Sequence, residues 1–240
     1  VYKRQGFPRT RYVGREGDGI TIAPLSVRAP LTVERRPEVS IREYNGAPTL
    51  FLDGRPDPFM HYVELRVGPQ RITNMADAGV HIYFLDAEDI GWKGPGNFDY
   101  TDWDAKILRV LALDPDAFII PQFTLDGRHQ SWWLAEHPEE LAQDESGSTQ
   151  VGVYHSKGQV ISLASQVWRQ EAGEAVRLFV THCRSAPYWT RVLGFLVASG
   201  VSWEWQHWGS VGQFEPTDYS EPMQEEFRKW VRREYGDDLE

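Results

Sequence analysis

The sequence predicts an α/β fold, in which four successive βα units form the first half of a (β/α)8, or TIM, barrel after a short β-hairpin region. From Pro58 onward, short apolar runs alternate with amphipathic helical stretches, which is the pattern of repeated βα units. The run from Val192 to Val197 is apolar enough for a strand covered on both faces, as in a parallel sheet. No Gly-rich phosphate turn follows any of the four strands. This disfavours the alternative, a doubly wound nucleotide-binding sheet.

Residues 6–55 are expected to form an amino-terminal β region, and residues 56–240 the barrel units. Asn45-Gly46 stands between VSIREY and PTLFLDG and predicts a hairpin, and Asp53-Gly54 predicts a second turn. Residues 1–5, VYKRQ, look like one reading frame of a transposase adaptor used in sequencing libraries, so they are excluded from the expected fold. The chain stops at GDDLE directly after a helical stretch. We therefore expect an internal fragment of a longer protein.

Each of the four expected strands is followed by a helix. Pro121 lacks the N–H that a ladder needs, so the third strand should end or bulge there. The connection from Thr124 to Ser165 is long, and it suggests a small hairpin at Lys157-Gly158. The expected strands are PFMHY at 58–62, VHIYFLD at 80–86, AFIIPQF at 117–123 and the apolar run at 192–197.

Four helices are expected from apolar side chains that recur every three to four residues. The second helix should begin at Thr101 or Asp102 and stop at Asp114-Pro115, and the last should run from a Ser220 cap to Gly236. The side chains expected to face the core are Ile72, Met75 and Ala76; Trp103, Ile107, Leu108 and Leu111; Val167, Trp168, Ala172, Ala175, Val176, Phe179, Val180 and Cys183; and Met223, Phe227, Trp230 and Val231.

The composition narrows the possible partners. The 240 residues are 41% hydrophobic and carry a net charge of -10, which argues against nucleic acid or an anionic membrane as a partner. A neutral substrate fits better, and ten tryptophans suit the faces of sugar rings as well as a core. Cys183 is the single cysteine, so no internal disulfide can form. No run is long enough to span a membrane; the compartment stays open with the cytoplasm favoured, and an oligomer is possible.

Glu204 is the strongest candidate for chemistry. It stands among Trp203, Trp205 and Trp208, just beyond the apolar run that ends near Val197. In α/β sheets and barrels the residues after the carboxyl ends of strands carry ligand chemistry. Because indole neighbours remove water, we expect a raised pKa and a general acid usable near neutral pH. The alternative is an exposed loop glutamate beside core tryptophans.

Other polar and aromatic residues also lie at or after expected strand ends, where a barrel would turn them toward one mouth. The histidines form no HxH or HExxH arrangement and there is no Gly-x-Ser-x-Gly elbow, so neither a metal, nor a cofactor, nor a serine nucleophile is expected. Trp132 and Trp133 are possible stacking platforms, although packing of the loop on itself explains them equally well. The candidate substrate-binding residues are His61, Asp86, Glu88, Gln122, Trp133, Trp205 and His207.

Three segments carry a resemblance to a known family. They are NGAPTLFLDGRPDPFMHY, the helix SQVWRQEAGEAVRLFVTHCRSAPYWTRVLGF, and GVSWEW followed by DYSEPMQEEFRKWVRREYG. Together they resemble the (β/α)8-barrel glycoside hydrolases of the β-galactosidase type, family 42 and its close relatives, over about residues 40 to 240.

The resemblance implies an oligosaccharide or glycoside substrate and a retaining mechanism. It implies that Glu204 is the general acid/base and that the nucleophile glutamate comes from a seventh strand, which this chain does not reach; alone, the chain is expected to hydrolyse nothing. Trp203 stands where that clan usually carries Asn before the acid/base. This departure keeps a second hypothesis open, a carbohydrate-binding barrel that has lost catalysis. A third is an open-sheet enzyme of unrelated chemistry.

Overall fold

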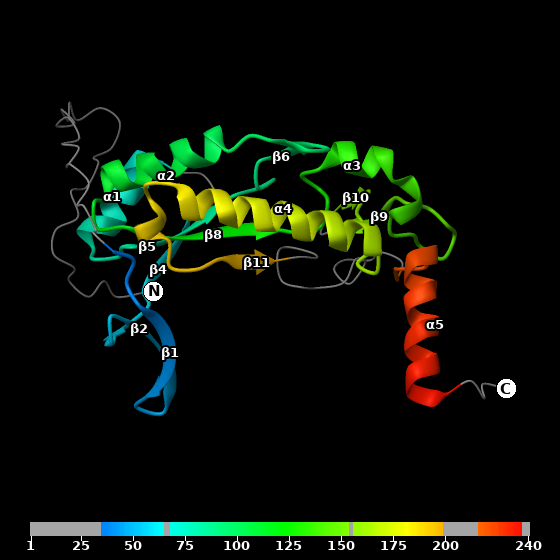
Figure 1. The fold of residues 1–240 in the computed structure, drawn as a ribbon, viewed down its shortest axis with the longest axis horizontal. Helices are drawn as coiled ribbons and strands as arrows, with labels where there is room; N and C mark the ends of the chain where they lie inside the picture. Colours follow the sequence, from blue (N-terminus) through cyan, green and yellow to red (C-terminus); the bar gives the residue numbers. More distant parts are fainter. Residues whose placement is uncertain (1–34, 65–67, 154–155, 199–215, 237–240) are drawn as a thin grey trace, which may run out of the picture. The chain divides into compact units, whose positions relative to one another are not determined.

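The structure is a computed structural model that describes residues 35–64, 68–153, 156–198 and 216–236. It shows a mixed α/β chain with a parallel sheet (Figure 1). The chain divides into two compact units. Unit 1 comprises Val1–Asp86, Asp102–Pro121 and Ser185–Leu196, and unit 2 comprises Ala87–Thr101, Gln122–Arg184 and Val197–Glu240. No helix among the described residues is long and apolar enough to cross a lipid bilayer.

The described part of unit 1 includes a three-stranded antiparallel sheet whose turns follow from the sequence. Asn45 and Gly46 have φ of 51° and 79°, the positive values that a type I′ hairpin turn requires. Asp53 and Gly54, with φ of 48° and 75°, make the second turn. Both predicted turns are confirmed. The strands are β1 (Val39–Tyr44), β2 (Ala47–Leu52) and β3 (Arg55–Asp57), hydrogen-bonded in that order.

The main sheet has four strands, and its neighbours follow the order of the chain. β4 and β5 pair in parallel, from His61 opposite Ile82 onward, and an isolated parallel bridge joins Ile119 to Val192. A doubly wound sheet would instead reverse its strand order at a switch point. The order therefore disfavours the doubly wound alternative. The strands are β4 (His61–Glu64), β5 (Ile82–Asp86), β8 (Phe118–Thr124) and β11 (Leu196–Ala198), in the spatial order β11-β8-β5-β4.

The first parallel strand lies three residues later than expected. We expected it at 58–62, but β4 starts at His61. The Asp57 carboxylate accepts the backbone N–H of Phe59 at 2.7 Å, and Phe59 has φ of 50°. An Asp side chain that bonds the backbone two residues on makes a turn. The segment before His61 is therefore a turn, and the apolar character of PFMHY did not reveal it.

The fourth strand is also shorter than expected. The run 192–197 was expected to be one strand covered on both faces, but β11 spans Leu196–Ala198, and Leu196 is 39% exposed. The Arg36 guanidinium donates hydrogen bonds to two backbone carbonyl oxygens that precede β11. Its Nε lies 2.6 Å from the oxygen of Val192, and a second bond reaches the oxygen of Leu193. These carbonyls bond to a side chain, and only Val192 joins the sheet, as a single bridge.

Pro121 does not end β8, which continues to Thr124. Alternate residues of a strand within a sheet bond to opposite neighbours. Ile119 O accepts the N–H of Leu193 at 3.0 Å, whereas Gln122 O accepts the N–H of Ala87 at 2.7 Å. Pro121 lies two residues after Ile119, so its backbone faces the same neighbour as Ile119 does. Its missing N–H therefore points toward residues 193–195, which do not form a strand. We expected Pro121 to interrupt β8 itself. Instead β8 is continuous, and the interruption is in its pairing with the segment 193–195.

The helices of unit 1 keep most of their expected faces. Hydrogen bonding of the Thr101 N–H to the Asp99 carboxylate at 2.9 Å starts the second helix. In it Ile107 and Leu111 are buried as predicted, but Leu108 is 55% exposed and Val110 is buried instead. The helices are α1 (Pro69–Asp77) and α2 (Thr101–Leu113), and the 3-10 turn η2 (Trp189–Arg191) follows later in the chain.

Unit 2 is organised around one long helix, α4 (Gln166–Ser185). Its buried side chains, Trp168, Ala172, Ala175, Phe179 and Cys183, all belong to the predicted face. The Ser165 hydroxyl accepts the N–H of Trp168 at 3.0 Å and caps the helix. The shorter elements are β6 (Trp92–Gly94), β7 (Asn97–Phe98), α3 (Ser131–Glu136), η1 (Pro138–Glu140), β9 (Val151–Val153) and β10 (Ser156–Gly158).

Two expectations in unit 2 need correction. The predicted excursion hairpin exists, but Ser156 pairs with Val153, so Lys157-Gly158 lies within β10 and not at the turn. The last helix, α5 (Glu221–Tyr235), ends at Gly236 as predicted, yet none of its residues is buried. Phe227 and Trp230 stack at 5.8 Å, and they are 58% and 41% exposed.

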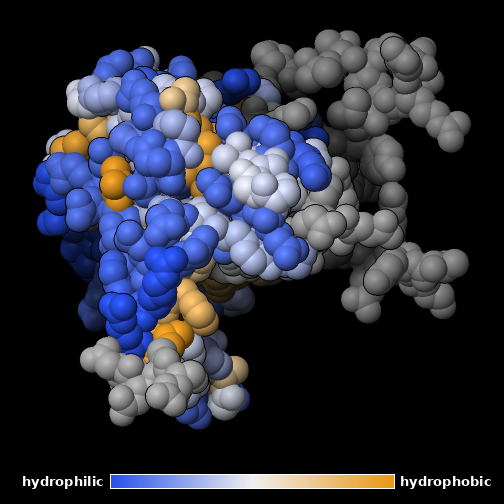
Figure 2. Space-filling model, turned by 90° about the vertical axis from the view of Figure 1, so that its right-hand side faces the viewer, coloured by the Kyte–Doolittle hydropathy of each residue, from blue (hydrophilic) through white to orange (hydrophobic). Residues whose placement is uncertain are grey.

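The face drawn in Figure 2 is largely hydrophilic, with apolar residues in separate patches.

Candidate functional site

The predicted acid Glu204 lies outside the described residues, as do Trp203, Trp205, His207 and Trp208. Their roles stay predictions. In unit 2 the described part of the candidate site is formed by the loop that follows β5 and by the end of β8, where ligand chemistry was expected.

His61 does not lie at a carboxyl end. Because β4 starts at this residue, the side chain is at the amino-terminal end of the strand, contrary to expectation. Its Nδ1 is 3.2 Å from the oxygen of Phe59, and its ring packs at 4.8 Å against both Phe59 and Phe84. These contacts give the exposed imidazole a place beside the turn that precedes β4.

Asp86 ends β5, as predicted, and it is half-buried. Its backbone oxygen accepts a hydrogen bond from Lys106 Nζ at 2.5 Å. A lysine from α2 is thus held against the end of the strand within unit 1. This contact fixes the backbone at the point where the chain leaves the sheet.

The loop after β5, in unit 2, has an unusual backbone. Glu88 and Ile90 have φ of 41° and 50°, a left-handed region that costs a residue with a side chain about 1–3 kcal/mol. Ile90 is also β-branched and only 2% exposed, so it is held there by burial. The N–H of Ala87 donates to Gln122 O at 2.7 Å and ties the loop to the end of β8. Strained loops of this kind occur often at functional sites, and this one carries the exposed Glu88.

Asp89 and Gly91 hold the loop in shape. The Asp89 carboxylate accepts the N–H of Gly91 at 2.9 Å and the ammonium of Lys93 at 2.5 Å. A Cβ on Gly91 would lie 2.6 Å from the carbonyl oxygen of Asp99, so only glycine fits. Hydrogen bonds from Thr101 lower the pKa of the Asp99 carboxyl. The Asp89 carboxylate has a structural role here, since its two oxygens bond within the loop.

The end of β8 brings two buried polar side chains together with this loop. Gln122 is 6% exposed, and none of the described residues hydrogen-bonds its side-chain amide. The Thr124 hydroxyl oxygen is buried and lacks a hydrogen-bond partner in the described part of the chain. An unpaired buried hydroxyl such as that of Thr124 costs free energy, and a ligand with hydroxyl groups could pair with it.

Asp126 follows β8 and is fully buried. Its Oδ2 accepts two hydrogen bonds from the Arg128 guanidinium, at 3.0 and 2.7 Å, and its Oδ1 accepts the Arg128 N–H at 3.0 Å. This pairing neutralises the carboxylate. Glu88, in the loop that follows β5, is exposed.

Trp133 was predicted to bind substrate, but the structure buries it completely. Its indole N–H donates to the Glu171 carboxylate at 2.6 Å. Its ring stacks on His137 at 4.3 Å and meets the edge of Trp168 at 4.9 Å. The ring is therefore closed to a sugar in this structure and packs in the core of unit 2.

The neighbouring Trp132 is the more accessible indole; the sequence offered both tryptophans as stacking platforms, but only Trp133 was placed among the substrate-binding candidates. It is half-buried, and its ring meets Trp92 edge to face at 5.1 Å. Gln130, just before it, donates from Nε2 to Asp89 O at 3.3 Å, which links the start of α3 to the loop after β5. The sequence could not separate the two tryptophans, since α3 has only six residues and its apolar face is too short to show a period.

In the described ranges no group of three or more His, Cys, Asp or Glu side chains could hold a metal ion. In unit 2 the Gln122 amide and the Thr124 hydroxyl offer hydrogen bonds to a ligand, and the Ala87 N–H joins the loop that carries Glu88 to the backbone of Gln122. Trp132 adds an apolar surface. Such a combination suits a polyhydroxylated ligand.

No protein-family model matches the chain, and no curated protein matches it in sequence. Among solved structures it is similar to the β-galactosidase from the psychrophilic Marinomonas ef1, with a TM-score of 0.50 and 18% sequence identity. The match covers 73% of this chain and 25% of that chain. The likeness shows the fold alone.

The chain thus spans about a quarter of the length of the β-galactosidase that it matches. At 18% identity, no residue role passes from that enzyme to this chain. What the match adds is a solved fold in which a comparable α/β arrangement occurs, consistent with the parallel strands described above.

Proposed function

We propose that this chain carries the acid/base part of a β-galactosidase-like glycoside hydrolase, built on the first four units of a (β/α)8 barrel. The observation that carries the proposal is the likeness in fold to a β-galactosidase over 73% of the chain. Two further features support it: the parallel strands follow the order of the chain, as in a barrel, and Glu204 comes shortly after β11 in the sequence.

In the proposed mechanism Glu204 acts twice. In the first step its carboxylic proton goes to the leaving oxygen as the glycosidic bond breaks, and a second carboxylate about 5 Å away bonds to the anomeric carbon. In the second step Glu204 takes a proton from water, the water oxygen bonds to the anomeric carbon, and the bond to the second carboxylate breaks. The family resemblance assigns that carboxylate to a seventh strand, beyond the four parallel strands of the sheet described here.

The described residues of unit 2 would bind the sugar. Glu88 and the Gln122 amide offer hydrogen bonds to hydroxyl groups, and Trp132 offers an indole for an apolar sugar face. Trp205 and His207, which flank Glu204 in the sequence, are proposed to complete the binding residues. Asp86 stays a candidate at the end of β5.

The test compares two aryl β-galactosides whose leaving groups differ in pKa, with enzyme made from the whole open reading frame that contains this chain. Glu204→Gln should lower the rate by about 10²–10⁴ on the poor leaving group and much less on the activated one, which needs no proton. Glu225→Gln, an exposed glutamate on α5, is the matched control and should change neither rate. Equal losses on both substrates, or no loss, would contradict the assignment. The 240-residue chain alone should release no phenol, since it would supply one of two carboxylates.

The second candidate is a carbohydrate-binding barrel without catalysis. Trp203 favours it, because the family usually carries an amide there to bond the sugar. Retained binding of galactose by the whole protein, with no turnover even before Glu204 is changed, would establish this candidate and exclude the first.

A further inference from the structure

Unit 1 contains a cavity of about 400 Å³, at the lower end of the range for small-molecule sites. Its walls come from segments that precede the parallel strands or begin them. His81 precedes β5, Phe118 begins β8, and Arg191 ends η2 just before the Val192 bridge. The cavity therefore lies at the amino-terminal ends of the strands. The proposed glycosidase chemistry uses the carboxyl ends.

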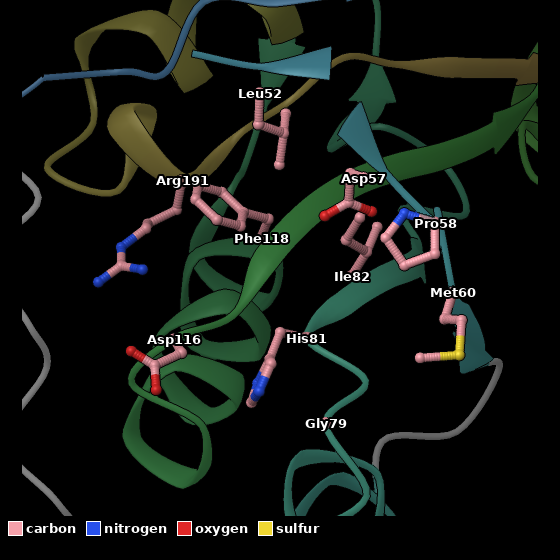
Figure 3. A pocket seen from close by; sticks show the side chains of 10 residues that line it. All are labelled: Leu52, Asp57, Pro58, Met60, Gly79, His81, Ile82, Asp116, Phe118 and Arg191. Carbon is pink, nitrogen blue, oxygen red and sulfur yellow. The ribbon is translucent and has the colours of Figure 1, made fainter. Parts of the chain in front are cut away.

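One end of the cavity is polar and is held in a fixed arrangement. His81, Asp116 and Arg191 lie at this end in Figure 3, while Met60 lies at the other. Asp114, 2% exposed, accepts hydrogen bonds from His81 Nδ1 at 2.9 Å and from the Tyr83 hydroxyl at 2.8 Å. With Nδ1 engaged, Nε2 is the imidazole nitrogen left for a ligand. Fixing one nitrogen of a histidine sets the orientation of the other.

The cavity is lined by charges of both signs. Asp57 and Asp116 contribute two carboxylates. Arg191, a residue that is 5% exposed, contributes a guanidinium whose central carbon lies 5.7 Å from the Phe118 ring centre. Burial lowers the pKa of Arg191, and the nearby carboxylates of Asp116 and Asp114 oppose that shift. A lone anion would meet the two carboxylates, and a lone cation would meet the guanidinium. A neutral ligand avoids both penalties.

The remaining groups specify what the neutral ligand should offer. One oxygen of Asp57 accepts the Phe59 N–H, and its other oxygen and the carboxylate of exposed Asp116 can accept further hydrogen bonds. Leu52, Ile82 and Met60 also line the cavity and provide its apolar wall. Several hydroxyl donors on a compact body with apolar C–H faces match this lining, and a hexose has both.

We propose that this cavity binds one neutral hexose unit at the amino-terminal ends of β5 and β8. Asp116, Asp57 and His81 Nε2 accept its hydroxyl groups, and its apolar face lies against Met60 and Leu52. The site needs no part of Glu204, so it can be tested independently of hydrolysis.

The test uses the 240-residue chain with ¹³C-labelled histidines and D-galactose as the probe. The His81 signal is assigned by its loss in His81→Gln, and it should shift saturably as D-galactose is added. Tetramethylammonium chloride and sodium acetate at the same ionic strength should leave it in place. Asp116→Asn should raise the apparent Kd about tenfold, the loss expected for one hydrogen bond to a charged group. Asp77→Asn, an exposed carboxylate at the end of α1, should leave the Kd unchanged.

Met60→Trp provides a second route, because this side chain is 53% exposed and a larger one fills the cavity from its rim. It should abolish the His81 shift, while the histidine signals other than that of the adjacent His61 keep their positions. A His81 signal that ignores D-galactose overturns the proposal, as does one that moves equally with either ion. If the shift disappears in Glu204→Gln and persists in Met60→Trp, the sugar binds elsewhere, which rejects this site and leaves the proposed hydrolase intact.

Discussion

Replacing Gly91 with alanine should destabilise the protein through two effects that can be separated. Gly91 has φ of 72°, where an alanine costs about 1–2 kcal/mol. A Cβ there would also lie 2.6 Å from both Asp99 O and an edge carbon of the Tyr100 ring. The ring cannot simply turn away, because it stacks on His182 at 4.1 Å. Overpacking of this kind costs about 1–3 kcal/mol more, so we expect a total loss of about 2–5 kcal/mol.

Gly96→Ala is the matched control. Gly96 has φ of 64° but nothing within 4 Å of its would-be Cβ, so it should lose only the conformational part, about 1–2 kcal/mol. Urea denaturation followed by tryptophan fluorescence gives both free energies of unfolding, with equal m values as the check that the unfolded state is unchanged. If Gly91→Ala costs no more than Gly96→Ala, the close approach of Asp99 and Tyr100 is not real, and the described shape of the loop is wrong.

Three further substitutions test other parts of the structure. Trp133→Phe should cost about 2–3 kcal/mol in the same denaturation assay, because it removes a partly buried hydrogen bond from the indole N–H to a carboxylate. Trp132→Phe should cost clearly less, because the indole N–H of Trp132 has no partner among the described residues; equal losses would contradict this. Burial, and then the Asp114 carboxylate, raises the pKa of Tyr83 above its ordinary 10.0. The contribution of the Tyr83 hydroxyl to the free energy of unfolding is therefore complete below about pH 10 and is lost as the pH rises above that. Tyr83→Phe should flatten the fall in urea midpoint between about pH 9 and about pH 11. A hydrogen bond from the Ser146 side chain is the largest cause that lowers the pKa of Asp144 from 3.8. The contribution of the Asp144 carboxylate to stability is therefore present above about pH 4 and disappears as the pH falls through the folded pKa. Asp144→Asn should remove that part of the acid-side fall in thermal stability, and an unchanged pH profile would refute this role of Asp144.

The features that were predicted well are those decided by a few neighbouring residues. Asn45-Gly46 adopts the positive φ values of its turn, because these residue types tolerate that conformation wherever they stand. The face of α4 from Trp168 to Cys183 follows from helical spacing alone. Local propensity and periodicity carry enough information for such elements.

The ends of the strands could not be predicted, because residues far away in the sequence decide them. The carbonyls of Val192 and Leu193 bond to Arg36, which lies 156 residues before Val192. No property of the apolar run 192–197 indicates that contact. Pro121 shows the same limit in another form, since its effect on the sheet depends on which neighbour its missing N–H faces.

The candidate site was predicted only as a set of strand ends. The positions of Asp86, Glu88 and Gln122 at those ends follow from the βα pattern, and the structure keeps them there. His61 lies at the amino-terminal end of β4 and not at its carboxyl end, because the turn formed by the Asp57 side chain makes the strand begin three residues later than expected. The buried Trp133 packs against Trp168 and donates to Glu171, both on α4, and the short segment around Trp133 gives no sign of either contact.

The backbone of the loop after β5 is the part that sequence rules were least able to anticipate, since it runs against them. Glu88 and Ile90 take up left-handed φ values that residues with side chains avoid, and Ile90 is of the type that avoids them most. Such a loop persists only because surrounding contacts over-determine it. Here the Ala87–Gln122 hydrogen bond, the Asp89 carboxylate and the Gln130 amide supply those contacts. Because local rules conflict with the fold mainly at functional or strained sites, this loop is where ligand binding by unit 2 should first be sought.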